Sequence, residues 1–288
     1  MFSHIPDLTE KERKQLERNV GYWAKKAQKT QETLTSKGIA EMENQLVHYY
    51  RNASTKIIGQ FEKVYEKVRL NISEGINPTP ADLYKLDAYW QMLGQTQKEL
   101  QKLGDNIMPY LTDGFISHYQ QIYEATALST DLSFGTIDRE AALQMINEIW
   151  CADGKNWSSR VWDNTKLLQE TLNDGLLECL LTGKQTNELK KVLQERFNVS
   201  YSRASRLVRT EMAHIQTQAA VKRYKDIGIE YVEVLADKDE RRCEICGKLH
   251  RQRFPINGAI PIPAHSNCRC CVIPVVDDFN EQLVLDGF

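Results

Sequence analysis

The sequence lacks long apolar runs and has no marked excess of charge of either sign. Of its 288 residues, 41% are hydrophobic and 26% are charged, and no stretch approaches the ~20 consecutive apolar residues of a membrane-spanning helix. Residues 1–15 also lack the basic and then apolar pattern of a secretion signal. We therefore expect a protein of the reducing cytoplasm that has no role in a membrane.

The formal net charge is only -2. Any affinity for nucleic acid must therefore come from a local patch, not from the charge of the whole protein. The sequence also has no internal repeat and no low-complexity segment. A chain of this length can bury a large core without help from disulfides.

The cysteines are distributed unevenly. Five of the seven lie within the last 46 residues, whereas Cys151 and Cys179 are isolated in segments with a helical pattern. An unpaired cysteine usually behaves as a small buried hydrophobic residue, so we expect these two thiols to lie in the core. In a chain without a secretion signal, the cluster indicates metal binding rather than disulfides.

Residues 1–130 have the pattern of long helices. Thr9 and Glu12 match a capping box, which places a helix start near Glu10. Further on, apolar residues recur at alternating spacings of three and four, typical of a buried face on a helix of roughly thirty residues. This stripe consists of Ile39, Met42, Leu46, Tyr49, Ala53, Ile57, Phe61, Val64 and Val68.

Prolines and glycines predict where these helices end. Residues 77–80 contain two prolines that break the helix, and Thr79 or Asp82 caps a third one. We expect the third helix to end between Gly104 and Pro109. Residues 131–136 resemble a joint, after which Asp138 caps another helix.

The remaining sequence changes from helical to β-rich at Gly228. Residues 157–225 have a helical pattern, interrupted at Gly175, Gly183 and 198–200, whereas 231–234 and 271–276 are strand candidates. The expected fold is mainly α: an elongated amino-terminal bundle, then a helical domain that ends in a small zinc-stabilised β-hairpin lobe (α+β). The expected divisions are 1–130 (bundle), 131–227 (helical domain), 228–276 (lobe) and 277–288 (tail).

The strongest local motif lies in the lobe. Cys243 and Cys246 form a C-x2-C pair, and a second group with His265, Cys268 and Cys270 follows after eighteen intervening residues. Two such turns from neighbouring segments can complete the tetrahedron that Zn2+ prefers. The preferred ligands are Cys243, Cys246, His265 and one of Cys268 or Cys270, with His250 and Cys271 in reserve.

Because the donors outnumber the four positions of a tetrahedron, we expect a closed, structural site without an open position for water. Folding of the lobe should then be coupled to metal binding, so chelation should unfold the region after Gly228.

The segment from Arg241 to Cys271 contains six cationic residues and one anionic residue. Its arginines suit bidentate contact with phosphate or with carboxylate, so DNA and an acidic partner protein both remain open as partners. The candidate phosphate contacts are Arg241, Arg242, Arg251 and Arg253.

Upstream of the lobe, Arg209, Glu211 and His214 lie on a predicted helix. A structural ion-pair network of Arg209 and Glu211, holding this helix against the lobe, is the preferred interpretation. Glu211 and His214 would also share one helix face, as acid/base and metal-binding pairs do.

In combination, these motifs resemble the phage head morphogenesis domain, the minor head protein family named for the Mu F protein, over residues 157–274. One departure is that Pro261 and Pro263 are separated where the family is expected to have adjacent prolines before the histidine. The motifs are Leu207-Val208-Arg209-Thr210-Glu211, Gly228, Tyr231, Asp239, the C-x2-C pair, and Pro263-x-His265-x2-Cys268-Arg269-Cys270.

The resemblance implies a low-copy, non-enzymatic component of the virion. Such a minor head protein lies in the capsid interior near the portal vertex, enters the procapsid in the host cytoplasm, and influences DNA packaging or ejection. Its expected partners are the portal protein and double-stranded phage DNA, bound non-specifically. The alternatives are a metal-dependent nuclease using Glu211 and His214, and a zinc-dependent DNA-binding regulator, although no recognition-helix module is recognisable.

Overall fold

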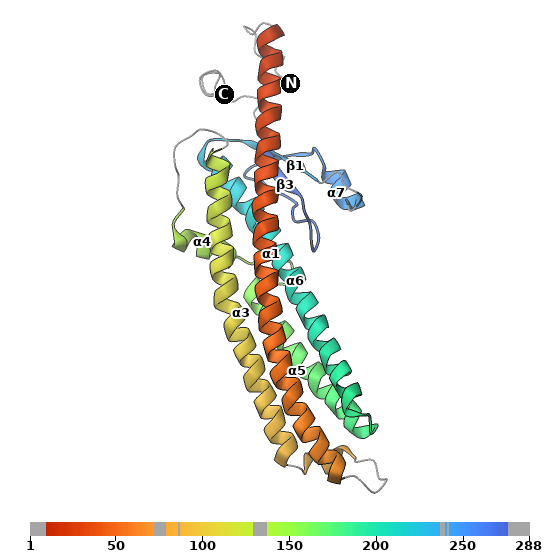
Figure 1. Cartoon of the computed structure of the whole chain (residues 1–288). Coiled ribbons are helices and arrows are strands. Elements are labelled where there is room, and N and C mark those ends of the chain that lie inside the picture. Colours follow the sequence, from red (N-terminus) through yellow and green to blue (C-terminus); the bar gives the residue numbers. More distant parts are fainter. Residues whose placement is uncertain are drawn as a thin grey trace. The chain divides into compact units, whose positions relative to one another are not determined.

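The computed structural model describes residues 10–71, 79–85, 87–128, 137–236, 240 and 242–275. Within these residues the chain forms seven helices and a small three-stranded antiparallel sheet, and Figure 1 shows their arrangement along the chain. The expected fold class, mainly helical with a small β lobe at the carboxyl end, is confirmed.

The chain divides into two compact units, each built from non-consecutive segments. Unit 1 comprises Met1–Ala40, Asp113–Glu148 and Val208–Phe288, and unit 2 comprises Glu41–Thr112 and Ile149–Leu207. The domain boundaries expected from the sequence remain a prediction.

Helix α1 spans Glu10–Asn71 without interruption. The two segments expected from the sequence are therefore parts of one helix of 62 residues, which begins where predicted, although Thr9 of the capping box lies outside the described residues. Gly38 lies inside this helix, where an added Cβ would be 2.6 Å from the terminal methyl group of Met212. The predicted stripe is largely buried, with Leu46, Ile57 and Phe61 fully so.

The short helix α2, Pro80–Tyr84, begins at the predicted cap, where the Asp82 carboxylate accepts a hydrogen bond of 3.1 Å from the Thr79 backbone N–H.

Helix α3 then spans Asp87–Leu128, so the predicted helix end between Gly104 and Pro109 is wrong. A Cβ at Gly104 would lie 2.3 Å from the Trp162 ring, which makes the glycine a packing residue. Pro109 is exposed, so water can satisfy the backbone carbonyl that it leaves without a donor.

Helix α4, Arg139–Ile146, is capped as predicted by Asp138, whose carboxylate accepts from the Ala141 N–H at 2.7 Å. Helices α5, Trp157–Leu181, and α6, Thr186–Asp226, follow. They are separated near Gly183, which has a φ of 64°. The interruptions predicted at Gly175 and at 198–200 are wrong, because both lie inside helices.

The sheet consists of β1 (Tyr231–Leu235), β2 (Arg253–Pro255) and β3 (Cys271–Pro274), in the order β2-β1-β3. Strands β1 and β3 were predicted, whereas the sequence pattern missed β2 and the helix α7, Glu244–Leu249. Both neighbours pair with β1 in antiparallel register, with Val232 opposite Phe254 and Val234 opposite Val272.

Unit 1 contains the sheet and buried polar contacts between its helical segments. The Gln31 amide of α1 donates to the Val272 carbonyl of β3 at 3.0 Å, and both residues are buried. The Thr35 hydroxyl lies 3.2 Å from Nε2 of His118 and also donates to Gln216. These bonds join β3 to α1, and join α1 to α3 and α6.

Unit 2 is held by apolar packing and by tyrosine hydroxyls. The Tyr50 hydroxyl accepts from the Asn164 amide at 3.0 Å, and the Tyr65 hydroxyl donates to the Cys179 carbonyl at 2.9 Å near the end of α5. Cys179 is fully buried, as predicted for a core thiol, whereas Cys151 is only partly buried.

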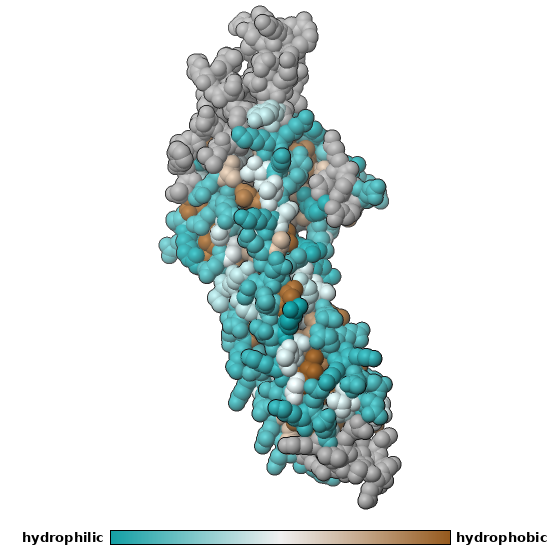
Figure 2. Space-filling model, in the orientation of Figure 1, coloured by the Kyte–Doolittle hydropathy of each residue, from teal (hydrophilic) through white to brown (hydrophobic). Residues whose placement is uncertain are grey.

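One face of the molecule is predominantly hydrophilic in its described part. On the face shown in Figure 2, apolar residues are scattered among hydrophilic ones. In the described part of the chain, no helix has both the length and the apolar composition required to cross a membrane.

Candidate metal centre

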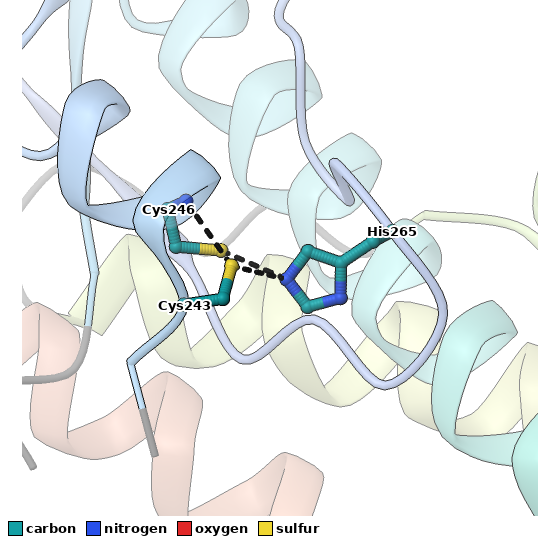
Figure 3. A group of neighbouring side chains, drawn as sticks. All are labelled: Cys243, Cys246 and His265. Carbon is teal, nitrogen blue, oxygen red and sulfur yellow. Dashed lines mark hydrogen bonds between the residues drawn. The ribbon is translucent and has the colours of Figure 1, made fainter. Parts of the chain in front are cut away.

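The first ligand turn lies at the start of α7. Cys243 occupies the N-cap position in an extended conformation, and its Sγ accepts a hydrogen bond of 3.3 Å from the Cys246 backbone N–H. This bond places the two sulfur atoms on the same side of the turn (Figure 3). The C-x2-C spacing thus produces the geometry for which it was singled out in the sequence.

The second ligand turn precedes β3. The Cys268 N–H donates to the His265 carbonyl at 3.2 Å, which closes the turn. Inside it, Asn267 has a φ of 60°, in the left-handed region that asparagine tolerates better than most residues. The His265 side chain extends from this turn toward the two sulfur atoms of the first turn (Figure 3).

The His265 ring has a defined tautomer. Its Nδ1 lies 2.8 Å from the Ser266 carbonyl oxygen, which only accepts hydrogen bonds, so Nδ1 carries a proton. Nε2 is then the ring atom that faces Sγ of Cys243 and Sγ of Cys246, 3.1 and 3.0 Å away. The hydrogen bond to the Ser266 carbonyl and the neighbouring thiols raise the pKa of the ring. One ring nitrogen and two sulfur atoms at these distances form an arrangement that a shared metal ion stabilises.

The cluster contains two overlapping groups of three possible ligands. One group is Cys243, Cys246 and His265, and the other is Cys246, Cys268 and Cys270; within each group the ligand atoms lie within 4.8 Å of one another. Sγ of Cys246 lies 3.8 Å from Sγ of Cys268. Zn–S bonds of ~2.3 Å in a tetrahedron place sulfur atoms ~3.8 Å apart, so this spacing suits zinc.

The four thiols differ in acidity. The hydrogen bond from Cys270 holds the pKa of Cys268 well below its usual range, at about 5, and the backbone N–H of Cys246 lowers that of Cys243. Burial raises the pKa of Cys246 to about 12, and hydrogen bonding to Cys268 raises that of Cys270. The protein without metal therefore favours a thiolate at Cys268, with Cys270 as its hydrogen-bond donor.

The two reserve ligands belong to neither group. Nδ1 of His250 accepts a hydrogen bond of 3.2 Å from the Ala236 backbone N–H. Cys271 is fully buried and packs with Leu235 and Ile273 in the core of the sheet. Each of these two side chains is therefore held by a contact outside the two groups of possible ligands.

The candidate phosphate contacts are in different environments. Arg251 forms an ion pair of 2.6 Å with Glu233, and Arg253 lies 3.8 Å from the same carboxylate. Arg242 is exposed, and Arg241 lies outside the described residues. Glu233 thus neutralises part of the charge that the sequence pattern assigned to this patch.

On α6, Glu211 and His214 are both buried. Burial lowers the pKa of His214 to about 4, so the ring is neutral at physiological pH. Neither residue belongs to the two ligand groups found among the described residues. Arg209 is exposed, and its ion pair with Glu211 remains a prediction.

The sequence motifs around this helix gave no role to Thr210. Its hydroxyl accepts a hydrogen bond of 3.2 Å from the Asn267 backbone N–H, in the middle of the second ligand turn. Thr210 belongs to the motif of residues 207–211, but no spacing pattern identifies a contact between residues 57 positions apart.

One region of the chain matches a known family. Residues 170–273 match the family described as Phage Mu protein F like protein. The chain contains a Mu F-like domain. This domain extends from within α5 to β3 and includes all five candidate ligands and Thr210, in agreement with the resemblance seen in the sequence.

One curated relative is a protein of Enterococcus faecalis (strain ATCC 700802 / V583) named NAD(+)-arginine ADP-ribosyltransferase EFV. It is 24% identical over 285 residues, which cover 91% of this chain and 57% of that protein. This chain therefore spans little more than half the length of that relative. No solved structure gives a significant match.

Proposed function

We propose that the chain is a phage minor head protein that joins the capsid interior at the portal vertex during procapsid assembly and influences DNA packaging or ejection. The observation that carries the proposal is the Mu F-like domain of residues 170–273, which contains the whole ligand cluster. The long helices α1, α3 and α6 provide extended faces for protein partners. In this proposal the chain functions by binding protein partners and not by catalysing a reaction.

We propose further that the ligand cluster binds one structural Zn2+ through Cys243, Cys246, His265 and Cys268. The fixed tautomer of His265, with Nε2 directed at two sulfur atoms, supports this choice of ligands. Cys270 then donates a hydrogen bond to the Cys268 sulfur atom. Four protein ligands leave no position for a reactive water, so the ion serves folding.

DNA binding is proposed as non-specific contact between phosphates and the exposed arginines of the lobe. Arg251→Ala and Arg253→Ala should each reduce the salt dependence of DNA affinity by about one counterion. Because Glu233 pairs with both arginines, Glu233→Gln should increase affinity. Filter binding over a salt series measures both effects, and an affinity indifferent to salt would exclude phosphate contact.

Two enzymatic alternatives have direct assays. The nuclease hypothesis needs Glu211 and His214 to reach a substrate, yet both are buried and the nearby ligands are mainly thiols, which suit zinc structure better than magnesium catalysis. We expect no DNA cleavage with Mg2+ or Mn2+. DNA cleavage that Glu211→Ala abolishes, and that zinc removal leaves intact, would support a nuclease.

The name of the Enterococcus faecalis relative suggests NAD+-dependent transfer to arginine. This chain spans 57% of that protein, and we expect it to leave NAD+ intact. NAD+ consumption by purified protein, absent from a heat-treated sample, would favour the enzyme instead.

The assembly function is tested by co-expression with the portal protein of the same phage genome. We expect the full chain to copurify with the portal protein, and Cys246→Ser to reduce recovery because the lobe loses its metal. The matched control is Cys151→Ser, a thiol outside both ligand groups. Full recovery of the chain without any portal protein would contradict the proposal.

A further inference from the structure

The second ligand turn is attached to helix α6 at its centre. Asn267 lies between His265 and Cys268 and has a left-handed backbone conformation. That N–H donates to the Thr210 hydroxyl at 3.2 Å. One hydrogen bond thus connects α6 with the peptide unit between two candidate ligands.

Helix α6 presents this hydroxyl from a rigid position. Val208 and Met212, two residues to either side of Thr210, are both completely buried, so this part of the helix is fixed by packing. Thr210 itself is half-buried. Its side chain therefore has a defined orientation before any metal binds.

The same ligand segment is also held at its far end. Val272 follows Cys270 by two residues, and its carbonyl accepts the hydrogen bond of 3.0 Å from Gln31 of α1. The residues between Asn267 and Val272 therefore run between two attachments to the helices of unit 1. Residues 256–270, by contrast, form no helix or strand, so these attachments replace regular secondary structure.

We propose that Thr210 is a positioning residue of the metal centre, which holds the His265–Cys268 turn against α6 so that both ligands reach the ion. This inference rests on the proposed zinc site. A metal ligand held in place before binding loses less conformational entropy on binding, and outer hydrogen bonds of this kind typically change metal affinity 10- to 100-fold.

The experiment compares zinc release from the full-length protein to a chromogenic chelator. Thr210→Val and Thr210→Ala remove the hydroxyl, and both should release zinc about tenfold faster than the wild type. Thr210→Ser keeps the hydroxyl and should stay within about twofold. Asn267→Gly keeps the N–H and permits the positive φ, so it should also resemble the wild type.

The matched control is Thr217→Val on the same helix. The Thr217 hydroxyl donates within α6, to the Ala213 carbonyl at 3.0 Å, and the residue is buried. The same chemical change should leave zinc release unchanged there. Replacement of zinc by Co2+ adds a readout of ligand geometry, because only the Thr210 variants without a hydroxyl should alter the cobalt d–d absorption.

Different outcomes test the two claims separately. Wild-type protein without bound zinc would overturn both the metal centre and the role of Thr210. Zinc-loaded wild type together with Thr210→Val and Thr210→Ala proteins that release zinc at the wild-type rate would overturn only the positioning role. Circular dichroism verifies that helix content is retained, and alanine, the best helix former, provides a second variant if valine disturbs α6.

Discussion

Cys246 is the residue on which the two ligand groups converge. Because it belongs to both groups, Cys246→Ser should reduce bound zinc from about one ion per chain to near zero. Cys270→Ser should retain most of the zinc, because the proposed role of Cys270 is to donate a hydrogen bond to Cys268. Elemental analysis of purified variants measures the difference, and equal loss in both would place Cys270 among the ligands.

Two buried histidines make stability depend on pH. Burial lowers the pKa of His118 and of His214 from 6.5 to about 4. The unfolded chain therefore binds protons that the folded chain does not between these values. The stabilisation that comes from the two neutral histidines should be fully present above pH 6.5. The free energy of unfolding should then fall as pH decreases toward 4, by roughly 1.4 kcal/mol per pH unit for each histidine.

Urea unfolding between pH 7 and pH 4 measures this slope. His118→Gln should reduce the slope by about half, because one of the two histidines no longer titrates. The control His48→Gln replaces an exposed histidine and should leave the slope unchanged. A slope that His118→Gln does not alter would show that other groups control acid unfolding.

At the residue scale, the sequence predicted which side chains cluster in the lobe but not the contacts that support them, and their role as metal ligands stays a prediction. Spacing identified Cys243, Cys246 and His265, because a C-x2-C turn has nearly the same local geometry in any fold. The Thr210 contact and the proton on Nδ1 of His265 depend on how distant segments meet. No pattern within one segment contains that information.

At the scale of elements, glycine and proline predicted helix ends less well than the apolar stripes predicted helices. The stripe of α1 was predicted because burial requires a periodicity near 3.6 residues. The continuation of α3 through Gly104 and Pro109 was not, because it depends on Trp162 lying against Gly104 and on solvent reaching the Pro109 turn. Both features arise only when distant segments pack together, so the local sequence does not reveal them.

Two glycines of α3 should respond oppositely to the same substitution. A Cβ at Gly104 would lie 2.3 Å from Trp162, whereas a Cβ at Gly94 would have nothing within 4 Å. Gly104→Ala should therefore destabilise the protein by about 1–3 kcal/mol through overpacking. Gly94→Ala should stabilise it by about 0.5–1 kcal/mol through helix propensity.

Urea denaturation of the two variants gives both free energies of unfolding. Stabilisation by Gly104→Ala would mean that Trp162 does not pack on this helix. A neutral or unfavourable Gly94→Ala would mean that this face of α3 is covered.

At the scale of the whole molecule, metal binding should stabilise only part of the chain against unfolding. The ligands all belong to unit 1, and β3 is bonded to α1 within that unit. Chelation should therefore expose backbone amides of residues 231–235 and 271–274 to hydrogen exchange. Residues 157–181 of α5, whose core lies in unit 2, should remain protected.

Hydrogen exchange with mass spectrometry resolves these peptides. Equal loss of protection in both units would mean that the metal controls the folding of the entire chain. Unchanged protection of β1 and β3 would mean that the lobe folds without metal.

The composition of the two units was beyond sequence reasoning. Local patterns end at each loop, whereas each unit combines segments that are far apart in the chain, such as Val208–Phe288 with Met1–Ala40. The small lobe could be predicted because its chemistry is local. The helical supports around it could not, because they are distributed over α1, α3 and α6.

X-ray absorption at the zinc edge of the purified full-length protein tests the central claim most directly, namely that the Mu F-like domain is built around a closed metal centre. The account predicts about one zinc per chain, bound by three sulfur atoms at ~2.3 Å and one nitrogen at ~2.0 Å. Absence of zinc, or a coordination shell containing water or carboxylate oxygen, would contradict it.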